Sequence, residues 1–484
     1  MIIQFDKNVD NLIYLMNVNY LLLCKGENNE RYKLSDYIVF QLSSFAISLI
    51  INQNANRNNT IASIQAFRCI LEGLSLLKMC GSGDINHVNE ELLLYYSYDC
   101  EFKIYKKFPE LDGILFNLDD IKERYEILKK NLEIYGLSKN KKNRLSWLNG
   151  FDNYRDIVEK YNNCVLQNYD LFGMIIHPND YRITSEYYDF FDCDSYINLV
   201  VNTCEMFFMK DTFDKSYDYH YLEAICRDER NKQLSDNSKK IMEIINDISN
   251  SLESKFGPNL VASIYKSVAM VIVECYFDII FGFKEITKCK FKPLFEMISL
   301  AHSAYSMDDV SFGKLFMHTI DKFKKILPND VDYLEINYEK FLGGFTDLDD
   351  FKSFLNRNIG LESISSLTNL VNNCIDSTVE DKEYASKIKV LYEQSQYLSH
   401  ANCYMLQSRF EIFNNGDDEF NYILDLLIRC FNIHLNTLIE ENKSSEKNCN
   451  KIIYDFKKNI NKLIQIKEEN YNQIKCKENK NMVQ

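Results

Sequence analysis

The chain has 484 residues, of which 46% are hydrophobic and 26% charged, a balance typical of a globular protein that can bury a large core without disulfides or metals. Its formal net charge of −14 argues against a broad nucleic-acid-binding surface. Glycine and proline are scarce, with 15 and 5 residues, and both interrupt helices, so the composition favours an all-α fold.

The spacing of apolar residues predicts helices along most of the chain. The segments, in chain order, are 36–55, 60–80, 89–107, 118–134, 152–177, 236–256, 260–283, 309–326, 380–413, 418–441 and 447–475. No stretch alternates apolar and polar residues well enough to predict a sheet. The five prolines are expected to separate helices, and they are Pro109, Pro178, Pro258, Pro293 and Pro328.

Neither a membrane span nor a secretory signal is predicted. Residues 37–51 are uncharged but too short to cross a bilayer, and residues 261–283 carry Lys266, Glu274 and Asp278. The N-terminus MIIQFDKNVDN lacks the basic and apolar regions of a signal peptide. The 15 cysteines include no Cys-x-x-Cys pair, so we expect reduced thiols in a cytoplasmic protein with no metal and no cofactor.

Two stretches of the chain share landmarks that suggest an internal duplication. One helix opens with IASI at Ile61 and another opens with VASI at Val261. Each is followed by two tyrosines and a histidine at eight-residue steps, Tyr161-Tyr169-His177 and Tyr384-Tyr392-His400. The shared order predicts two tandem, related helical bundles, residues 1–190 and 236–440, joined by an irregular segment at 191–235. The alternative is coincidence between amphipathic helices.

Residues 441–484 form a basic tail with ten lysines against six acidic residues, a net charge of +4 that leaves −18 on the rest of the chain. The apolar residues Ile453, Phe456, Ile460, Leu463 and Ile464 fall at helical intervals. They predict an amphipathic C-terminal helix that docks on the body or on a partner, with its lysines in solvent.

Four motifs of the first half, AFRCILEGLSLLK, YYSYDCEFKIY, WLNG and YDLFGMIIHP, resemble an uncharacterised bacterial helical family, domain of unknown function 5677. The matching positions are Arg68, Glu72, Trp147, Gly150, Tyr169 and His177; Gly173 stands where the family pattern would have serine. The second half keeps Tyr392 and His400, but Met270 precedes Glu274 where an arginine would be expected. The resemblance implies an all-helical fold and supplies no activity.

Arg68 and Glu72 lie one helical turn apart on an otherwise apolar helix, so both are expected to be partly buried and paired. One interpretation joins them with His177 in a polar pocket, with Arg68 holding an anion and His177 moving a proton, and Tyr169 is a further candidate binding residue. Tyr392 and His400 would be the counterparts in the second half. The other interpretation is an ion pair that joins two helices, beside a histidine that caps a helix end.

The hexapeptide RCFNIH places Arg429 five residues before His434, which resembles the Arg-x4–6-His motif of HEPN ribonucleases. That resemblance implies metal-free RNA cleavage, with His434 assisting proton transfer and Arg429 holding the scissile phosphate. The spacing is expected to place both side chains on one helix face. The alternative is a pair at the edge of the core.

These observations lead to one expectation and one alternative. We expect a cytoplasmic all-helical interaction or regulatory protein that binds another protein or itself, and no membrane. The composition, rich in asparagine and lysine, suggests an AT-rich genome, where large helical proteins often belong to stress or phage-defence systems. The alternative is a HEPN-like ribonuclease, or another phosphate-handling enzyme, and RNA is an expected partner only in that case.

Overall fold

The computed structural model describes residues 61–81, 99–114, 116–134, 153–175, 229–256, 260–280, 284–306, 367–399, 417–444 and 450–481, together with Leu42, Phe45, Ser48 and Leu49. The helices are α3 (Ile61–Gly81), α5 (Leu118–Ile134), α6 (Tyr154–Tyr161), α7 (Leu166–Ile175), α11 (Glu229–Phe256), α12 (Leu260–Ile280), α13 (Lys284–Ser306), α17 (Leu367–Thr378), α18 (Lys382–Leu398), α20 (Asp417–Ser444) and α21 (Asn450–Asn481), with 3-10 helices η2 (Pro109–Leu111) and η3 (Asn163–Val165). These ranges hold no strand, only an isolated bridge between Asp112 and Phe116. The predicted all-α class is confirmed.

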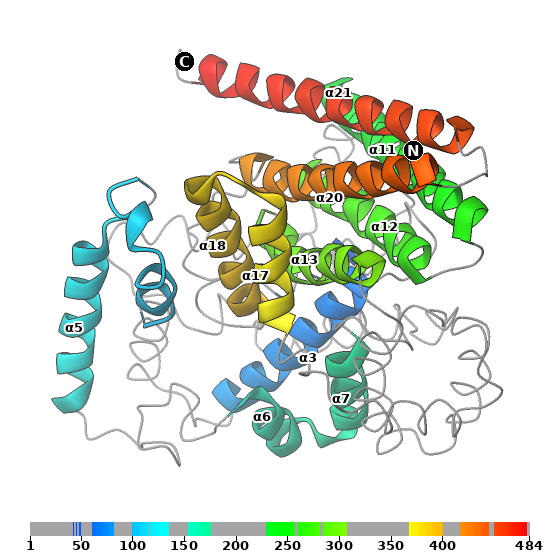
Figure 1. Cartoon of the computed structure of the whole chain (residues 1–484). Helices are drawn as coiled ribbons and strands as arrows, with labels where there is room; N and C mark the ends of the chain where they lie inside the picture. Colours follow the sequence, from blue (N-terminus) through cyan, green and yellow to red (C-terminus); the bar gives the residue numbers. More distant parts are fainter. Residues whose placement is uncertain are drawn as a thin grey trace, which may run out of the picture.

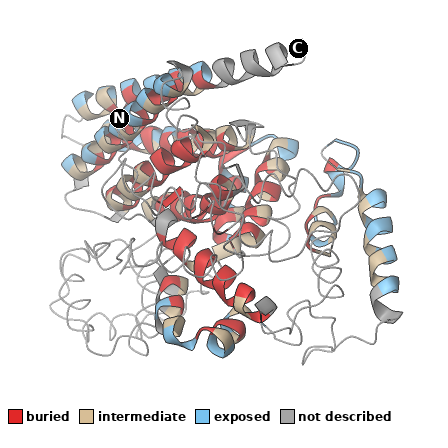
Figure 2. Cartoon of the chain, turned by 180° about the vertical axis from the view of Figure 1, so that it is seen from behind, coloured by how far each residue is buried: buried red, intermediate tan, exposed pale blue. Residues whose placement is uncertain are grey.

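One continuous hydrophobic core joins the seven helices of the second half, α11, α12, α13, α17, α18, α20 and α21 (Figure 1). Helix α12 packs between α11 and α13, and α13 also packs against α17, α18 and α20. Helix α12 is apolar on nearly all sides, as a helix enclosed by others must be. Figure 2 shows the buried residues concentrated in α12, α13, α20 and α3.

The prediction that the basic tail forms a docked amphipathic helix is confirmed. Helix α21 packs on α11 and α20, and it buries Phe456, Ile460 and Leu463. Lysines of its first turns, including Lys451 and Lys458, are exposed. A buried chain of hydrogen bonds fixes its position along α11 and α12. Asn237 of α11 donates to Asn470 at 2.7 Å, and Asn470 donates to the Tyr276 hydroxyl of α12 at 2.6 Å.

The described parts of the first half lie directly against the second. Helix α3 packs on α6 and α7 and also contacts α12 and α13 (Figure 1). The segment around η2 packs on α18, where Ile104, Phe108 and Leu111 bury their side chains with Val390. Because α3 contacts elements of both halves, this helix lies at the junction between them.

One described segment, Glu419–Lys443 in α20, has the length and hydropathy of a membrane span. In the apolar 18-residue window of this segment, 56% of the residues are buried among other helices. A core helix of a soluble protein meets the same test, so this is weak evidence for a membrane.

Several predicted boundaries were wrong. Pro293 does not separate helices but lies inside α13, a helix that the periodicity did not predict. The predicted helix at 152–177 is broken after Tyr161 into α6 and α7. Helix α17 was also not predicted. Helix α11 begins at Glu229, inside the segment predicted to be irregular, and α20 runs past the predicted boundary at 440.

The tyrosine frame is built differently in the two halves. Tyr161 ends α6 and Tyr169 lies in α7, whereas Tyr384 and Tyr392 lie on the single helix α18. The frame therefore does not mark one repeated helix, and the tandem duplication stays a prediction. His177 and His400, the last residues of the frame, lie outside the described residues.

Candidate functional site

Three of the predicted site residues meet in the interior. On α3, Nε of Arg68 lies 3.5 Å from Oε1 of Glu72, and Tyr169 of α7 donates a hydrogen bond to the same oxygen at 2.8 Å. Nη2 of Arg68 donates to the Tyr169 hydroxyl at 3.4 Å, and its guanidinium lies 5.4 Å from the centre of that ring. Glu72 is fully buried. Arg68, Glu72 and Tyr169 form a triad in which each side chain contacts the other two, and this triad links α7 to α3.

Burial and charge together set the protonation of this triad. Burial alone would lower the pKa of Arg68, but the charge of Glu72 and the interactions with Tyr169 together outweigh it, and the pKa rises. Burial, and then the negative charge of Glu72, raise the pKa of Tyr169 well above its usual value. Tyr169 therefore stays a neutral hydrogen-bond donor, and Arg68 and Glu72 stay an ion pair.

We expect Tyr169→Phe to destabilise the folded protein by about 1–3 kcal/mol, because the buried Glu72 carboxylate loses a hydrogen bond. Chemical denaturation followed by circular dichroism gives the free energy of unfolding. The matched control is Tyr454→Phe, since Tyr454 is 66% exposed and should cost less than about 0.5 kcal/mol. Equal costs at the two positions would contradict the role given to Tyr169.

A second set of the same kind is present in the second half. The stretch FKPLFEMISL of α13 (Phe291–Leu300) matches FRCILEGLSL of α3 (Phe67–Leu76) in Phe, Glu, Ser and Leu and in the basic residue after Phe. Lys292 and Glu296 take the places of Arg68 and Glu72. Burial, and then the charge of Glu296, raise the pKa of Tyr392, the frame tyrosine of this half.

This second set was missed because the shared IASI and VASI landmarks pair α3 with α12. The expected counterpart of Glu72 was Glu274, but Glu296 is the glutamate whose charge acts on Tyr392. The signal was present in the ten-residue match and in the nearly equal spacing from each glutamate to its tyrosine. Tyr392 also packs its ring edge-on against Phe295, with ring centres 5.6 Å apart.

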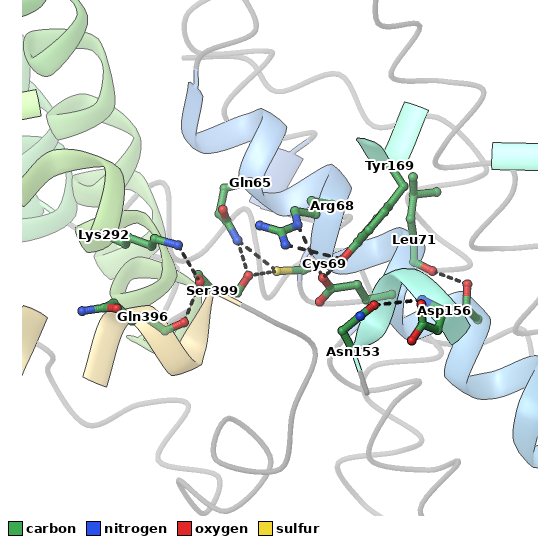
Figure 3. A network of polar contacts seen from close by, with 12 residues as sticks. Gln65, Arg68, Cys69, Leu71, Asn153, Asp156, Tyr169, Lys292, Gln396 and Ser399 are labelled. Atoms are coloured by element: carbon green, nitrogen blue, oxygen red, sulfur yellow. Dashed lines mark hydrogen bonds and ion pairs between the residues drawn. The ribbon is translucent and has the colours of Figure 1, made fainter. Parts of the chain in front are cut away.

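The two sets approach one another around Ser399, at the C-terminal end of α18 (Figure 3). From α3, the Gln65 amide and the Cys69 thiol donate to the Ser399 carbonyl. From α13, Nζ of Lys292 lies 3.5 Å from the Ser399 hydroxyl, which donates to the Gln396 carbonyl at 2.6 Å. Side chains of α3 and α13 therefore converge on one residue at the end of α18.

A third buried charge cluster lies on the same helix α13. Nζ of Lys290 lies 2.6 Å from Asp278 and 3.5 Å from Glu274, both on α12, and donates to Ser48 at 3.2 Å. Ser48 in turn donates to Asp278 at 2.6 Å. Burial alone would lower the pKa of Lys290, but the two carboxylates, Asp278 first, raise it. The sequence signal was the pair of acids four residues apart on an apolar helix.

The expectation that Arg429 and His434 share a helix face was wrong. Five residues turn an α-helix by about 500°, which leaves the two side chains roughly 140° apart. The guanidinium of Arg429 pairs with Asp425 at 2.6 Å and lies over the Tyr384 ring of α18. His434 instead points into the core and has no exposed surface. The two side chains do not face a common substrate position.

His434 lies among aromatic rings of α12 and α13. Its Nδ1 is 3.3 Å from the Tyr265 hydroxyl, and its ring stacks on Tyr305 with centres 4.0 Å apart. His302 stacks nearly parallel to it at 5.7 Å. Burial, and then the charge of His302, lower the pKa of His434 to about 3. His434 is therefore neutral at neutral pH.

Within the described ranges, no group of three or more histidine, cysteine or acidic side chains could hold a metal ion. Comparisons with protein-family models, with curated proteins and with solved structures found no match to this chain. The resemblances to the family of unknown function and to the HEPN ribonucleases therefore stay predictions.

Proposed function

We propose that this chain is an all-helical interaction or regulatory protein that acts by binding another protein or a second copy of itself. The observation that supports it is the internal pairing of the candidate catalytic groups. Arg68 is held by Glu72 and Tyr169, Arg429 by Asp425, and His434 is enclosed. A catalytic acid, base or phosphate clamp must reach its substrate within hydrogen-bond distance, and these side chains reach one another instead.

The packing of the two halves supports the same proposal. The basic–glutamate–tyrosine sets of α3 and α13 lie on either side of one junction, and α3 contacts α13 directly. Buried charge networks favour one arrangement of helices over others, since any other arrangement leaves charges unpaired. Such a junction would hold the two halves as one rigid scaffold. The stress or phage-defence setting suggested by the composition belongs to this proposal.

The proposal is tested by finding and rebuilding the complex. The tagged full-length chain is cross-linked in its native cells, each cross-linked protein is purified, and the two are mixed and weighed by light scattering. We expect a complex of fixed stoichiometry, or a stable oligomer of the chain alone. A chain that stays monomeric with each purified candidate contradicts the proposal.

The ribonuclease alternative makes a separate prediction. We expect the purified protein to cleave no single-stranded RNA above background, because His434 has no exposed surface. The assay compares wild type with His434→Phe and Arg429→Gln, and with a catalytically independent control, Lys458→Gln, on the exposed face of α21. Cleavage by wild type that is lost in His434→Phe and Arg429→Gln and kept in Lys458→Gln would establish the alternative instead.

A further inference from the structure

Two buried thiols lie against each other between α17 and α20. Sγ of Cys374 in α17 is 3.8 Å from Sγ of Cys430 in α20, and neither cysteine is bonded in a disulfide. Both side chains are buried. Other buried thiols are placed differently, since Cys69 and Cys289 donate to backbone carbonyls at the end of α18. The contact of two sulfurs makes Cys374 and Cys430 a candidate pair for a covalent link.

The positions of the two cysteines suit a disulfide. Helices α17 and α20 pack directly on one another (Figure 1). A disulfide bond is about 2 Å long, so the two sulfurs need to approach each other by less than about 2 Å. Cys374 and Cys430 are 56 positions apart, so a bond between them would close a long loop that contains α18. Because such a link restricts the unfolded chain, it would stabilise the folded state.

Burial determines how fast this pair can react. Burial, and then the neighbouring Cys374 thiol, raise the pKa of Cys430, so the enclosed thiol stays protonated and is a poor nucleophile. Helix α17 has only 12 residues, and its outer face is exposed at Asn373, Asp376 and Ser377. A short helix at the surface separates from its neighbours more readily than an enclosed one. We therefore expect oxidation to require an opening of α17 and to take minutes to hours.

We propose that Cys374 and Cys430 form a reversible disulfide between α17 and α20 when the chain meets a low-molecular-weight disulfide. This goes beyond the proposed partner-binding role and does not depend on it. One protein thiolate attacks a sulfur of the small disulfide and expels a small thiolate; the second protein thiolate attacks the resulting mixed disulfide and expels the other. The protein thiols lose two protons and two electrons, and the small disulfide is reduced to two thiols. In a reducing compartment the pair returns to thiols.

The test is incubation of the reduced full-length protein with oxidised glutathione, followed by blocking of free thiols and peptide mapping by mass spectrometry. We expect the peptides of Cys374 and Cys430 to be joined at least about tenfold more often than any other cysteine pair, because their contact gives them the higher effective concentration. Dithiothreitol should reverse the bond, and the oxidised chain should unfold at a higher urea concentration than the reduced chain. The incubation is repeated in urea below the unfolding transition, so that slow opening of α17 cannot hide the reaction.

Two variants assign the effect to this pair. Cys430→Ala should lose both the joined peptides and the rise in stability on oxidation. Cys289→Ala is the matched control and should keep both, because Cys289 is also buried but its thiol donates to the Leu398 carbonyl. Circular dichroism checks that both variants fold, and the mapping of wild type decides the proposal if either does not. Thiols of Cys374 and Cys430 that stay reduced in wild type even in urea, that retain glutathione, or that pair with other cysteines overturn the proposal.

Discussion

Below about pH 6.5 the wild-type protein should lose stability that a His434→Phe variant keeps. The folded-state pKa of His434 is about 3, below the ordinary value of 6.5. As the pH falls, the unfolded chain therefore binds a proton at His434 that the folded chain refuses. The contribution of neutral His434 to the free energy of unfolding is complete above the unfolded pKa of about 6.5. Below that pH it falls by up to about 1.4 kcal/mol per pH unit, which amounts to a loss on the order of 5 kcal/mol by pH 3.

The comparison of the two proteins isolates His434 from the other titrating groups. Near neutral pH the variant should be less stable by about 1 kcal/mol, because Tyr265 loses its hydrogen-bond partner. Near pH 4.5 it should be the more stable protein by roughly 1–2 kcal/mol, since the wild type has by then lost about 2.7 kcal/mol at His434. Urea unfolding at a series of pH values measures both.

A control addresses the neighbouring titratable groups. His302 stacks on His434, but it is only partly buried and forms a hydrogen bond with Ser377. Burial lowers the pKa of His302. His302→Phe should therefore change the pH dependence less than His434→Phe does. A stability difference between wild type and His434→Phe that stays constant from about pH 7.5 to 4.5 would show that His434 is not held neutral.

The fold class and the pairing of Arg68 with Glu72 could be predicted from the sequence, and the reasons are physical. Scarce glycine and proline and three- to four-residue apolar spacing leave helices as the only regular element. Arg68 and Glu72 stand on an apolar helix, so burial obliges them to pair. Their contact with Tyr169 required the packing of α7 on α3, which spacing within either helix does not contain.

The second set escaped prediction because of one residue. Proline in a helix interior removes a hydrogen bond and usually ends or kinks the helix, so Pro293 was interpreted as a separator. Helix α13 nevertheless continues through it, stabilised by packing against α12, α17, α18, α20 and α3. With α13 unpredicted, the glutamate of α12 became the expected counterpart of Glu72, and the match between Phe67–Leu76 and Phe291–Leu300 had no helix to support it.

The pair Arg429 and His434 shows a different kind of error. The motif spacing suggested a shared face, but five residues turn the helix too far. The rotation per residue of an α-helix is sufficient to separate the two side chains. The rotation does not predict how deeply His434 is buried, because the rings that enclose it, Tyr265 and Tyr305, come from other helices.

Lys290→Met should destabilise the protein by about 3–5 kcal/mol, the usual cost of leaving a buried carboxylate without its partner. Lys290 is 1% exposed, and both Asp278 and Glu274 are as deeply buried. Removing its ammonium leaves two negative charges at the α12–α13 interface. Urea unfolding at neutral pH measures the loss.

The matched control is Lys266→Met, which breaks the ion pair with Glu253 between α12 and α11 at the surface. The side chains of Lys266 and Glu253 are 39% and 31% exposed, so water screens the ion pair. The loss of unfolding free energy should therefore be below about 1 kcal/mol. Both lysines form an ion pair between α12 and a neighbouring helix. A difference in cost between the two variants therefore measures the effect of burial and not the presence of an ion pair.

A third protein tests the explanation itself. If the cost of Lys290→Met comes from unpaired carboxylates, then adding Asp278→Asn and Glu274→Gln should recover most of it, since amides in place of both charges remove the need for a counter-ion. Recovery would assign the energy to charge. If the triple variant is as unstable as Lys290→Met alone, the lysine acts through packing of its aliphatic chain, and the cluster is not an electrostatic link between α12 and α13.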